Sequence, residues 1–427
     1  MSLGTAVVLA AASLPAAAST SLFGTAAAPA RAAAAGDRVI RALDADRTTA
    51  SWRVVDVAAA AVSSTTPRLL LDLAPGLTLE ARRDDGYANA DGTVVWIGST
   101  PSRATRFPVG GHDPGNAVIL VRNGDNVAGT VRTGGRLFRL EPLAGRGHAL
   151  VEIDESAWPA DHPPGAAPQP PAAVPAGLGV LARPGPIPRP NPGSVPRRTP
   201  EVTPPTTTRT RIDAMVVITA SAAAAVGDPQ AFIQLAIAET NQGYRNSWIP
   251  IDMHLAGWYQ TAYATADFST DLSRFQGTAD GFLDEYHGIR NQIGADVNIL
   301  LIRDPAYQYC GLAYLNASAA YAFSVTDHRC ATGNYTFAHE IGHNQGAHHD
   351  PANAANSYFA YGHGYQMQAH GWRTVMAYAC SGTPACPRIN AWSNPKRFRS
   401  GVAMGTGDRS NNARVLDETR GRVAGFR

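Results

Sequence analysis

The sequence predicts two folding units: an α/β domain over residues 210–427, preceded by a β-rich module over residues 36–157. The first half consists of short β-branched runs separated by turn residues, whereas the second half alternates strand-like and helix-like patterns. Between them, residues 158–209 hold just over half of the chain's 31 prolines. Proline at that density cannot supply the backbone donors of a helix or a sheet, so we interpret this stretch as an extended linker.

The overall composition limits the class of protein. Hydrophobic residues make up 44% of the 427 residues, enough to build a buried core, and the formal net charge is only +2. A nucleic-acid-binding surface needs a concentrated excess of Lys and Arg, so we expect no nucleic acid as a partner. After the N-terminus no segment approaches the roughly 18 uninterrupted apolar residues of a transmembrane helix. We therefore expect no membrane span, and we expect a monomer.

Residues 1–35 are the first element in chain order, and 15 of them are Ala. An apolar run from Leu3 to Ala18 is typical of a secretory signal peptide, with small-residue cleavage patterns that end at Ala18 and at Ala35. No Lys or Arg precedes Arg31, so a displaced start or an Ala-rich leader is the alternative. On the first interpretation the protein is secreted and extracellular.

The module of residues 36–157 is expected to be mostly antiparallel, with Gly124-Asp125 and Gly134-Gly135 as tight turns. It contains no cluster of catalytic side-chain types. We expect its strands at residues 51–57, 68–73, 93–97, 117–121, 127–131, 136–140 and 148–153.

The α/β half opens with a buried strand at residues 212–219 and an amphipathic helix at 229–246, which Asp228 caps with proline at the first helical position. Further strands are expected at residues 249–259, 296–303, 311–315 and 321–325.

The chemistry is expected in the run HEIGHNQGAHHD, which begins at His339. At about 100° per residue, His339 and His343 lie one turn apart on one helix face, so both imidazoles can reach one metal ion. Gly346 permits the left-handed backbone that ends the helix, and His349 can then turn back as a third ligand. Three neutral imidazoles leave a fourth position open for water, which is the arrangement of a catalytic zinc site.

Glu340 completes this pattern, because it points to the side of the two histidines and can take a proton from a zinc-activated water without being a ligand. Phe337 and Ile341 fall on the opposite face of the helix and are expected to anchor it in the core. His348 is out of register with the ligands. Any one of these histidines alone could be an ordinary surface or core residue, but the five-position pattern is much more specific than its parts.

The pattern HExxHxxGxxH resembles the signature of the metzincin zinc endopeptidases. The resemblance implies an α/β metzincin catalytic domain with a mixed, twisted sheet, an active-site helix and a methionine turn. Thr374-Val375-Met376-Ala377-Tyr378 is similar to that turn, and its methionine lies 27 residues after His349, which implies Met376 beneath the metal. It also implies that Tyr378 helps to stabilise the tetrahedral intermediate. For both Met376 and Tyr378, the alternative is an ordinary packed core residue. Asp350 is similar to the structural aspartate of adamalysins (reprolysins), although those enzymes carry Pro where this chain has Tyr378.

The fuller resemblance is to bacterial reprolysin-like enzymes of the peptidyl-Asp metalloendopeptidase type, and it covers roughly residues 210–427. It implies a zymogen whose propeptide, residues 36–157, inhibits the catalytic domain of the same chain. The carrying segments are CGLAY at 310–314, DHRCATGNY at 327–335, the zinc motif, GHGY at 362–365, RTVMAY at 373–378 and PRINAWSNP at 387–395, with VVWIG at 94–98 and LEPL at 140–143 as a weaker likeness to reprolysin propeptides.

This resemblance implies hydrolysis of protein or peptide substrates, bound as an added strand along an edge such as residues 311–315. It also implies a preference for an acidic residue, Asp, at P1′, the position after the cut. Such a preference needs a basic residue in the pocket, and Arg373 and Arg388 are near the methionine turn in sequence, as are Lys396 and Arg397. A solvated surface charge is the commoner state of each.

All four cysteines fall late in the chain, and proximity favours the disulfides Cys310–Cys330 and Cys380–Cys386. Disulfides suit an exported protein, and four reduced thiols are the alternative. The module before the linker has no cysteine, so it cannot silence the zinc through a thiolate as some relatives do. The candidates for latency are then Asp154, Asp161, His162 or simple blockage of the cleft.

Two rival functions remain at this stage. A secreted binding or adhesion protein could carry a structural zinc ion, but such a site needs no general base like Glu340. A thermolysin-like peptidase would use a distant glutamate instead of His349. Calcium (Ca2+) binding has nothing in the sequence to support it. Maturation is expected to leave a new N-terminus between about Thr199 and Ile212.

Overall fold

The computed structural model describes residues 19–25, 37–101, 113–143, 147–162, 208–354, 357–382 and 386–427. Residues 1–18, which hold the predicted signal sequence, and residues 163–207 of the predicted linker lie outside the described part of the chain. No helix of the described residues is long and apolar enough to cross a membrane.

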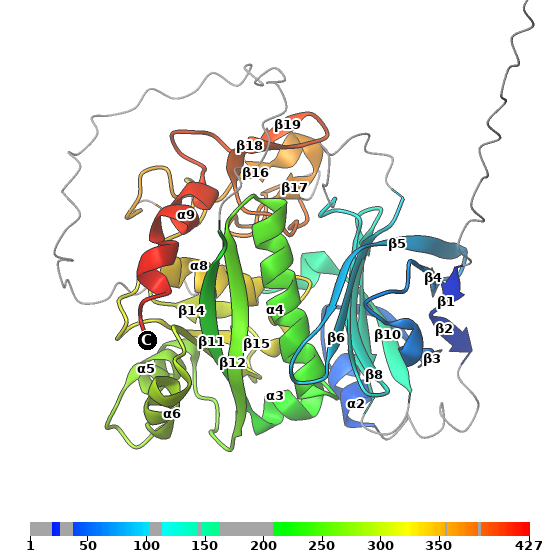
Figure 1. The fold of residues 1–427 in the computed structure, drawn as a ribbon, viewed down its shortest axis with the longest axis horizontal. Helices are drawn as coiled ribbons and strands as arrows, with labels where there is room; N and C mark the ends of the chain where they lie inside the picture. The colour runs from blue at the N-terminus through cyan, green and yellow to red at the C-terminus, as the bar shows by residue number, and fades with distance from the viewer. Residues whose placement is uncertain are drawn as a thin grey trace, which may run out of the picture.

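The N-terminal region forms a ten-stranded sheet in the order β1-β4-β5-β6-β7-β8-β9-β10-β3-β2 (Figure 1). All of its neighbouring pairs are antiparallel except β1 with β4. The strands are β1 (Thr20–Ser21), β2 (Phe23–Thr25), β3 (Thr49–Val57), β4 (Arg68–Ala74), β5 (Leu77–Ala88), β6 (Val94–Ser99), β7 (Ala117–Asn123), β8 (Asn126–Thr133), β9 (Arg136–Pro142) and β10 (His148–Ile153).

The segment from Thr20 to Thr25 lies within the stretch predicted as a leader, yet it belongs to this sheet. Its first part pairs with β4 and its second part pairs with β3, so it joins the two edges of the sheet. Leu22 between them is fully buried in the core of the module. Edge strands need partners for their backbone groups, and this segment supplies them at both edges.

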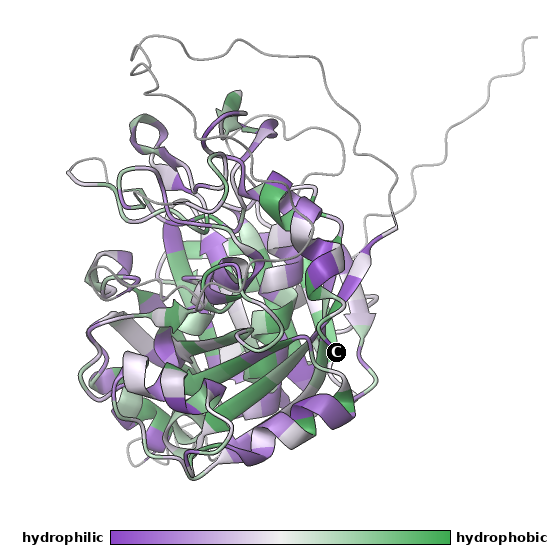
Figure 2. Ribbon diagram, turned by 90° about the vertical axis from the view of Figure 1, so that its left-hand side faces the viewer, coloured by the Kyte–Doolittle hydropathy of each residue, from purple (hydrophilic) through white to green (hydrophobic). Residues whose placement is uncertain are grey.

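The C-terminal region contains a five-stranded mixed sheet in the order β12-β11-β13-β15-β14, in which only β14 is antiparallel to its neighbour. The strands are β11 (Thr210–Thr219), β12 (Ile251–Thr261), β13 (Val297–Ile302), β14 (Gly311–Ala313) and β15 (Phe323–Asp327). β14 is one of the two edge strands, as expected for residues 311–315. The hydrophobic strands lie inside the molecule and the polar faces of the helices lie outside (Figure 2).

The remaining elements surround this sheet or extend it at the C-terminus. They are α2 (Arg38–Asp44), η1 (Ala59–Ala61), η2 (Glu155–Ala157), α3 (Ala220–Ala225), α4 (Pro229–Asn246), α5 (Phe268–Gln276), α6 (Glu285–Ile293), α7 (His328–Ala331), α8 (Thr336–Gln345), β16 (Gln366–Met367), η3 (Gln368–His370), β17 (Trp372–Arg373), β18 (Asn394–Arg399), β19 (Val402–Met404) and α9 (Asn412–Val423).

Helix α4 joins the two regions, because it lies between the two sheets (Figure 1). One face places Ala231, Leu235 and Ala238 against β6, β7 and β8 of the N-terminal sheet. The other face packs into the core of the C-terminal sheet through residues such as Ile233 and Ile237. An amphipathic helix normally buries one face, and this helix buries two because each sheet covers one of them.

Polar contacts reinforce the same interface. The buried carboxylate of Glu239 on α4 accepts hydrogen bonds from the Thr130 hydroxyl at 2.6 Å and from the backbone N–H of Gly333 at 3.0 Å. Arg132 on β8 pairs with both oxygens of Glu155 at 2.7 and 2.9 Å and donates to the Gly333 carbonyl at 3.1 Å. The N-terminal region is therefore docked by apolar packing and by buried charge-assisted hydrogen bonds.

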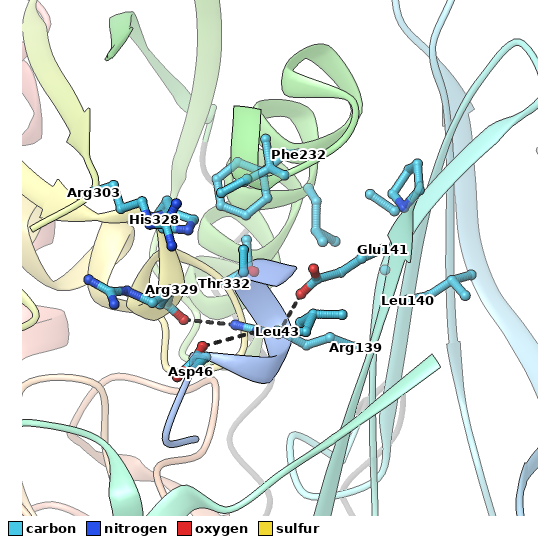
Figure 3. A pocket seen from close by; sticks show the side chains of 17 residues that line it. Leu43, Asp46, Arg139, Leu140, Glu141, Phe232, Arg303, His328, Arg329 and Thr332 are labelled. Atoms are coloured by element: carbon cyan, nitrogen blue, oxygen red, sulfur yellow. Dashed lines mark hydrogen bonds and ion pairs between the residues drawn. The ribbon is translucent and has the colours of Figure 1, made fainter. Parts of the chain in front are cut away.

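A pocket also lies at this interface (Figure 3). Inside it, Arg139 makes an ion pair with Glu141 at 3.0 Å and donates to the Arg329 carbonyl at 2.9 Å. None of the histidines of the zinc motif lines this pocket. The chemistry expected from the sequence is therefore located elsewhere.

Both predicted disulfides are present. Cys310 is joined to Cys330, and Cys380 is joined to Cys386, with Cα–Cα distances of 5.4 and 5.7 Å. The first bridge connects the start of β14 to α7, and it thereby ties the edge strand to the segment that leads into α8.

Candidate metal centre

Helix α8 carries the first two histidines of the motif and is buried along its whole length. Phe337 and Ile341 anchor it in the core, as the spacing predicted. The helix ends at Gly346, whose φ of 105° is the left-handed conformation that glycine adopts without strain. The chain then turns back, which brings His349 beside the helix.

The three histidines converge on one point. The Nε2 atom of His343 lies 3.1 Å from that of His339 and 3.0 Å from that of His349, and the latter two are 3.2 Å apart. Nitrogen ligands at the usual zinc distance of about 2.0–2.1 Å in a tetrahedral site lie about 3.3 Å from each other. The observed spacing therefore fits ligands of a single small cation.

The protonation of these rings also fits a metal. The Nδ1–H of His339 donates to the Val375 carbonyl and that of His343 donates to the Ala347 carbonyl, both at 2.9 Å. Each neutral ring therefore presents a bare Nε2 lone pair to the centre of the group. Burial holds the pKa of all three imidazoles well below the ordinary value, so they are neutral. Converging lone pairs repel one another unless a cation lies between them.

A fourth histidine completes the group, and it comes from the N-terminal half of the chain. His162 is buried and its Nε2 lies 3.0 Å from that of His339. The potential ligand atoms of His162, His339, His343 and His349 all lie within 4.8 Å of one another. His348 is outside this group, and its Nδ1 accepts the backbone N–H of His349.

Glu340 lies beside the histidines without belonging to their group. Both of its carboxylate oxygens are buried without a hydrogen-bond partner among the described residues, and Oε1 lies 3.3 Å from Nε2 of His162. Burial raises the pKa of Glu340, an effect that the nearby His162 partly offsets. A Cβ atom on Gly311 of the edge strand would lie 2.3 Å from Oε1, so this carboxylate needs a glycine opposite it.

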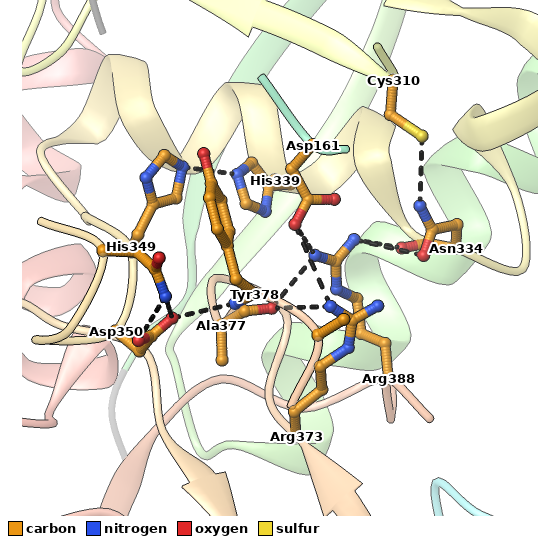
Figure 4. Close-up of polar contacts among 12 residues, drawn as sticks. Asp161, Cys310, Asn334, His339, His349, Asp350, Arg373, Ala377, Tyr378 and Arg388 are labelled. Atoms are coloured by element: carbon orange, nitrogen blue, oxygen red, sulfur yellow. Dashed lines mark hydrogen bonds and ion pairs between the residues drawn. The ribbon is translucent and has the colours of Figure 1, made fainter. Parts of the chain in front are cut away.

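The segment from Thr374 to Tyr378 contacts two of the histidines. Its Val375 carbonyl orients His339, and Met376 is fully buried against Gly342 of α8. The Tyr378 ring lies beside His349, with 4.4 Å between their ring centroids (Figure 4). The carboxylate of Asp350 accepts the backbone N–H of Tyr378 at 3.0 Å and so connects this segment to the loop that carries His349.

Arg373 and Arg388 are buried, so the expectation of solvated surface charges is wrong for both. They face the carboxylate of Asp161, which lies 2.6 Å from Nη2 of Arg388 and 4.0 Å from Nη1 of Arg373 (Figure 4). Burial alone would raise the pKa of Asp161, but the two arginines hold it below its ordinary value. Burial and the neighbouring Arg388 lower the pKa of Arg373 to about 9.

The other two basic residues considered for this pocket lie elsewhere. Lys396 is exposed, as expected. Arg397 is buried, so the expectation of a solvated charge is wrong for it as well; it donates to the Asn246 carbonyl and stacks over Trp248. The sequence offered Asp161 and His162 only as separate candidates for latency, beside Asp154 and simple blockage of the cleft. A single Asp-His pair carries no spacing signal, because its partners follow more than 170 residues later.

Comparison with known proteins identifies the family. The model of metallo-peptidase family M12, of the reprolysin type, matches residues 208–393. A protein named peptidyl-Asp metalloendopeptidase from Stenotrophomonas maltophilia (strain K279a) is 41% identical over 407 residues, which cover 93% of this chain and 91% of that protein. The chain belongs to metallopeptidase family M12. A metalloendopeptidase of the same printed name from Xanthomonas campestris pv. campestris is 42% identical over 385 residues, 89% of this chain and 86% of that one.

The chain is therefore a zinc metalloendopeptidase, and the resemblance to the bacterial enzymes is confirmed. Zinc is the metal that this family implies, and the converging imidazoles fit it by distance and by protonation.

Proposed function

We propose that this chain is the zymogen of a secreted endopeptidase that cleaves peptide bonds on the amino side of aspartate. One observation carries the proposal. Asp161, the residue before the histidine that joins the metal group, places its carboxylate on Arg388 and near Arg373. The relatives from Stenotrophomonas and Xanthomonas are named for action at aspartate, which supports the same preference.

The two arginines suit an acidic P1′ side chain. Arg388 also donates to the carbonyls of Asn334 and Ala377, at 3.0 and 3.1 Å, so its guanidinium is held in one orientation. A buried and oriented arginine recognises a carboxylate through charge-assisted hydrogen bonds, whereas a neutral side chain leaves its positive charge without a counter-charge. We infer that Asp161 occupies the place of the P1′ side chain of a substrate.

Three histidines, His339, His343 and His349, would hold the zinc ion. Zinc supplies Lewis acidity and lowers the pKa of water to about 7. Glu340 is the general base: its unpartnered, buried carboxylate accepts the proton of the attacking water and delivers it to the leaving amine. The hydroxyl of Tyr378 donates a hydrogen bond to the developing oxyanion, while Met376 and Asp350 hold the segment beneath the histidines.

The substrate main chain would add to the edge strand β14. In this chain the backbone N–H of Gly311 donates to the Asp161 carbonyl at 3.0 Å, and that of Cys310 donates to the Ala160 carbonyl at 3.0 Å. Once the N-terminal region has left, these N–H groups would be free at the edge of the sheet, where an extended peptide could accept their hydrogen bonds. The N-terminal region therefore blocks the same groups that a substrate needs, which supports its assignment as a propeptide.

Secretion is supported by the Ala-rich N-terminus and by two disulfides, which persist in oxidising compartments. Of the two cleavage patterns in the leader, the one that ends at Ala18 would keep strands β1 and β2 in the sheet of the propeptide. We therefore favour Ala18 over Ala35. Maturation would then release residues 19 to about 200.

The first test of this function separates the base from the zinc ligands. Glu340→Gln should reduce peptide hydrolysis by at least about 100-fold, because proton transfer is lost. It should leave bound zinc, measured by atomic absorption, at one ion per chain, because Glu340 is not a ligand. Unchanged hydrolysis would refute the mechanism, and lost zinc would assign Glu340 to the metal.

The second test addresses specificity within one enzyme. In a library of peptides that differ only at P1′, Arg388→Ala should lower the ratio of kcat/KM for Asp over Ala by roughly 10- to 100-fold, the cost of a hydrogen bond to a charged group. A general folding defect lowers both values and cancels in the ratio. No enrichment of Asp after the cut by the unchanged enzyme would contradict the proposed preference.

A further inference from the structure

The last described residues of the N-terminal region cross the metal centre. Ala160 forms a parallel bridge with Tyr309, and the backbone of residues 160 and 161 is held by the N–H groups at the start of β14. Trp158 packs against the Cys310–Cys330 bridge with Tyr307. Three successive anchors therefore fix the chain directly before His162.

His162 stands where a fourth ligand would stand. Its ring centroid lies 5.0 Å from that of His339, 4.9 Å from that of His343 and 4.6 Å from that of His349. Its side chain is almost fully buried, and its Nε2 faces both the histidine group and Glu340. An imidazole in this position excludes the water that Glu340 would deprotonate.

We propose that His162 is the fourth protein ligand of the zinc ion in the latent chain, and that Asp161 holds it there by filling the arginine pocket. We call this arrangement of Asp161 and His162 the latch. It rests on the proposed function, because it assumes that the zymogen carries catalytic zinc. A site with four protein ligands is closed, as in structural zinc sites, whereas catalysis needs an open position. Departure of His162 would open that position and free Glu340 in one step.

The two residues act together for a geometric reason. Asp161 and His162 are adjacent, so the ion pair between Asp161 and Arg388 restricts where the imidazole can go, and the second interaction has a high effective concentration. The chain has no cysteine before Cys310, so a propeptide thiolate cannot take this position. A histidine latch needs no redox chemistry, and it is lost when the N-terminal region leaves.

The test uses the full-length chain in the Glu340→Gln background, which prevents self-cleavage. X-ray absorption at the zinc edge should show four imidazole nitrogens. His162→Ala should replace one of them by a water oxygen, seen as weaker scattering from imidazole rings, and should speed zinc loss to a chelator by roughly 10-fold or more, because one ligand is missing. Three nitrogens and one oxygen in the chain that keeps His162 would overturn the proposal.

A second variant gives a positive signal. With cobalt in place of zinc, His162→Cys should produce a thiolate-to-cobalt charge-transfer band, since a thiolate ligates the same metals. The matched control is His254→Cys, at a half-exposed histidine on β12 that pairs with Asp213, and it should give no such band. Absence of the band for a folded His162→Cys chain would count against the latch.

The outcomes separate the latch from the proposed function. If the zinc spectrum shows no ligand from His162 while the matured enzyme still cleaves before aspartate, the latch alone fails. If the latch is seen but the matured enzyme shows no such cleavage, the proposed specificity fails and the ligand assignment stands.

Discussion

Glu340 depends on a residue that carries no side chain. Gly311, on the edge strand, leaves the space that the carboxylate occupies, and a Cβ atom there would lie 2.3 Å from Oε1 and 2.7 Å from Cδ. The Oε1 and Cδ atoms cannot move aside easily, because the Glu340 side chain is completely buried on α8. The position of the proposed base is therefore set by a neighbouring strand as much as by its own helix.

This contact predicts the effect of Gly311→Ala. The added methyl should displace the carboxylate by about 1 Å and lower kcat/KM by roughly 100-fold, the usual cost of such a misplacement. Zinc content should stay at one ion per chain, since the ligands are not touched. Steady-state kinetics and metal analysis of the mature enzyme check this.

The matched control for this variant is Gly288→Ala, because Gly288 lies in helix α6 with no atom within 4 Å of the added methyl. It should keep full activity and should stabilise the helix slightly. Equal kinetics of the two variants would contradict the dependence of Glu340 on Gly311.

At the scale of elements, the two disulfides close loops of different length near the site. Cys310–Cys330 spans 20 residues and Cys380–Cys386 spans 6. A crosslink stabilises mainly by restricting the unfolded chain, and the restriction grows with the length of the closed loop. The longer bridge also fixes β14 relative to α7, so it supports the edge strand where the Asp161 backbone lies.

Replacing both cysteines of the longer bridge by serine should lower the free energy of unfolding by about 3 kcal/mol, and the same change at the shorter bridge should cost about 2 kcal/mol. The two double variants serve as controls for each other, because each replaces one disulfide by two serines. Urea unfolding measures both values. A larger loss at the shorter bridge would contradict the loop-length argument.

The elements themselves were predictable to different degrees. Helix α4 has the bounds expected from its proline, its Asp228 cap and its periodicity, and these features act locally. β5 was not predicted, because the alternation of Leu77, Leu79 and Ala81 ends in a charged run up to Asp85. Pairing with β4 and β6 holds that polar half in the sheet, and pairing of this kind is not visible in its own sequence.

At the scale of the whole molecule, the buried carboxylate of Glu239 links the two regions. Burial raises the pKa of Glu239 to about 7, against an ordinary value of 4.5, although Thr130 and Gly333 donate hydrogen bonds to it. The folded chain therefore holds a proton that the unfolded chain has lost between these two values. This contribution to stability is fully present below about pH 4.5 and is lost as the pH rises through about 7.

We therefore expect Glu239→Gln to flatten the pH dependence of stability. The free energy of unfolding of the full-length Glu340→Gln chain should fall by up to about 3 kcal/mol as the pH rises from about 4.5 to about 7. The Glu239→Gln variant should lose most of that slope. Glu418→Gln, at an exposed carboxylate of α9, is the control and should keep it. Equal slopes for all three chains would contradict the assignment.

The sequence by itself determined the metal motif, because its information is local. The spacing of His339, His343 and Gly346 follows from helix periodicity and from the conformational freedom of glycine, and the short separation of the cysteines favoured their pairing. The pattern therefore predicted the convergence of three imidazoles and the position of Glu340 beside them. The structure reproduces this arrangement.

Only the tertiary structure decided what faces that motif. Docking of the N-terminal sheet on α4 brings Asp161 to Arg388 and His162 to His339, across separations of 227 and 177 residues. No periodicity connects such distant positions, because their meeting depends on how two separately formed cores pack on one helix. The same packing buries Arg373 and Arg388, whose charges the sequence alone would have assigned to the solvent.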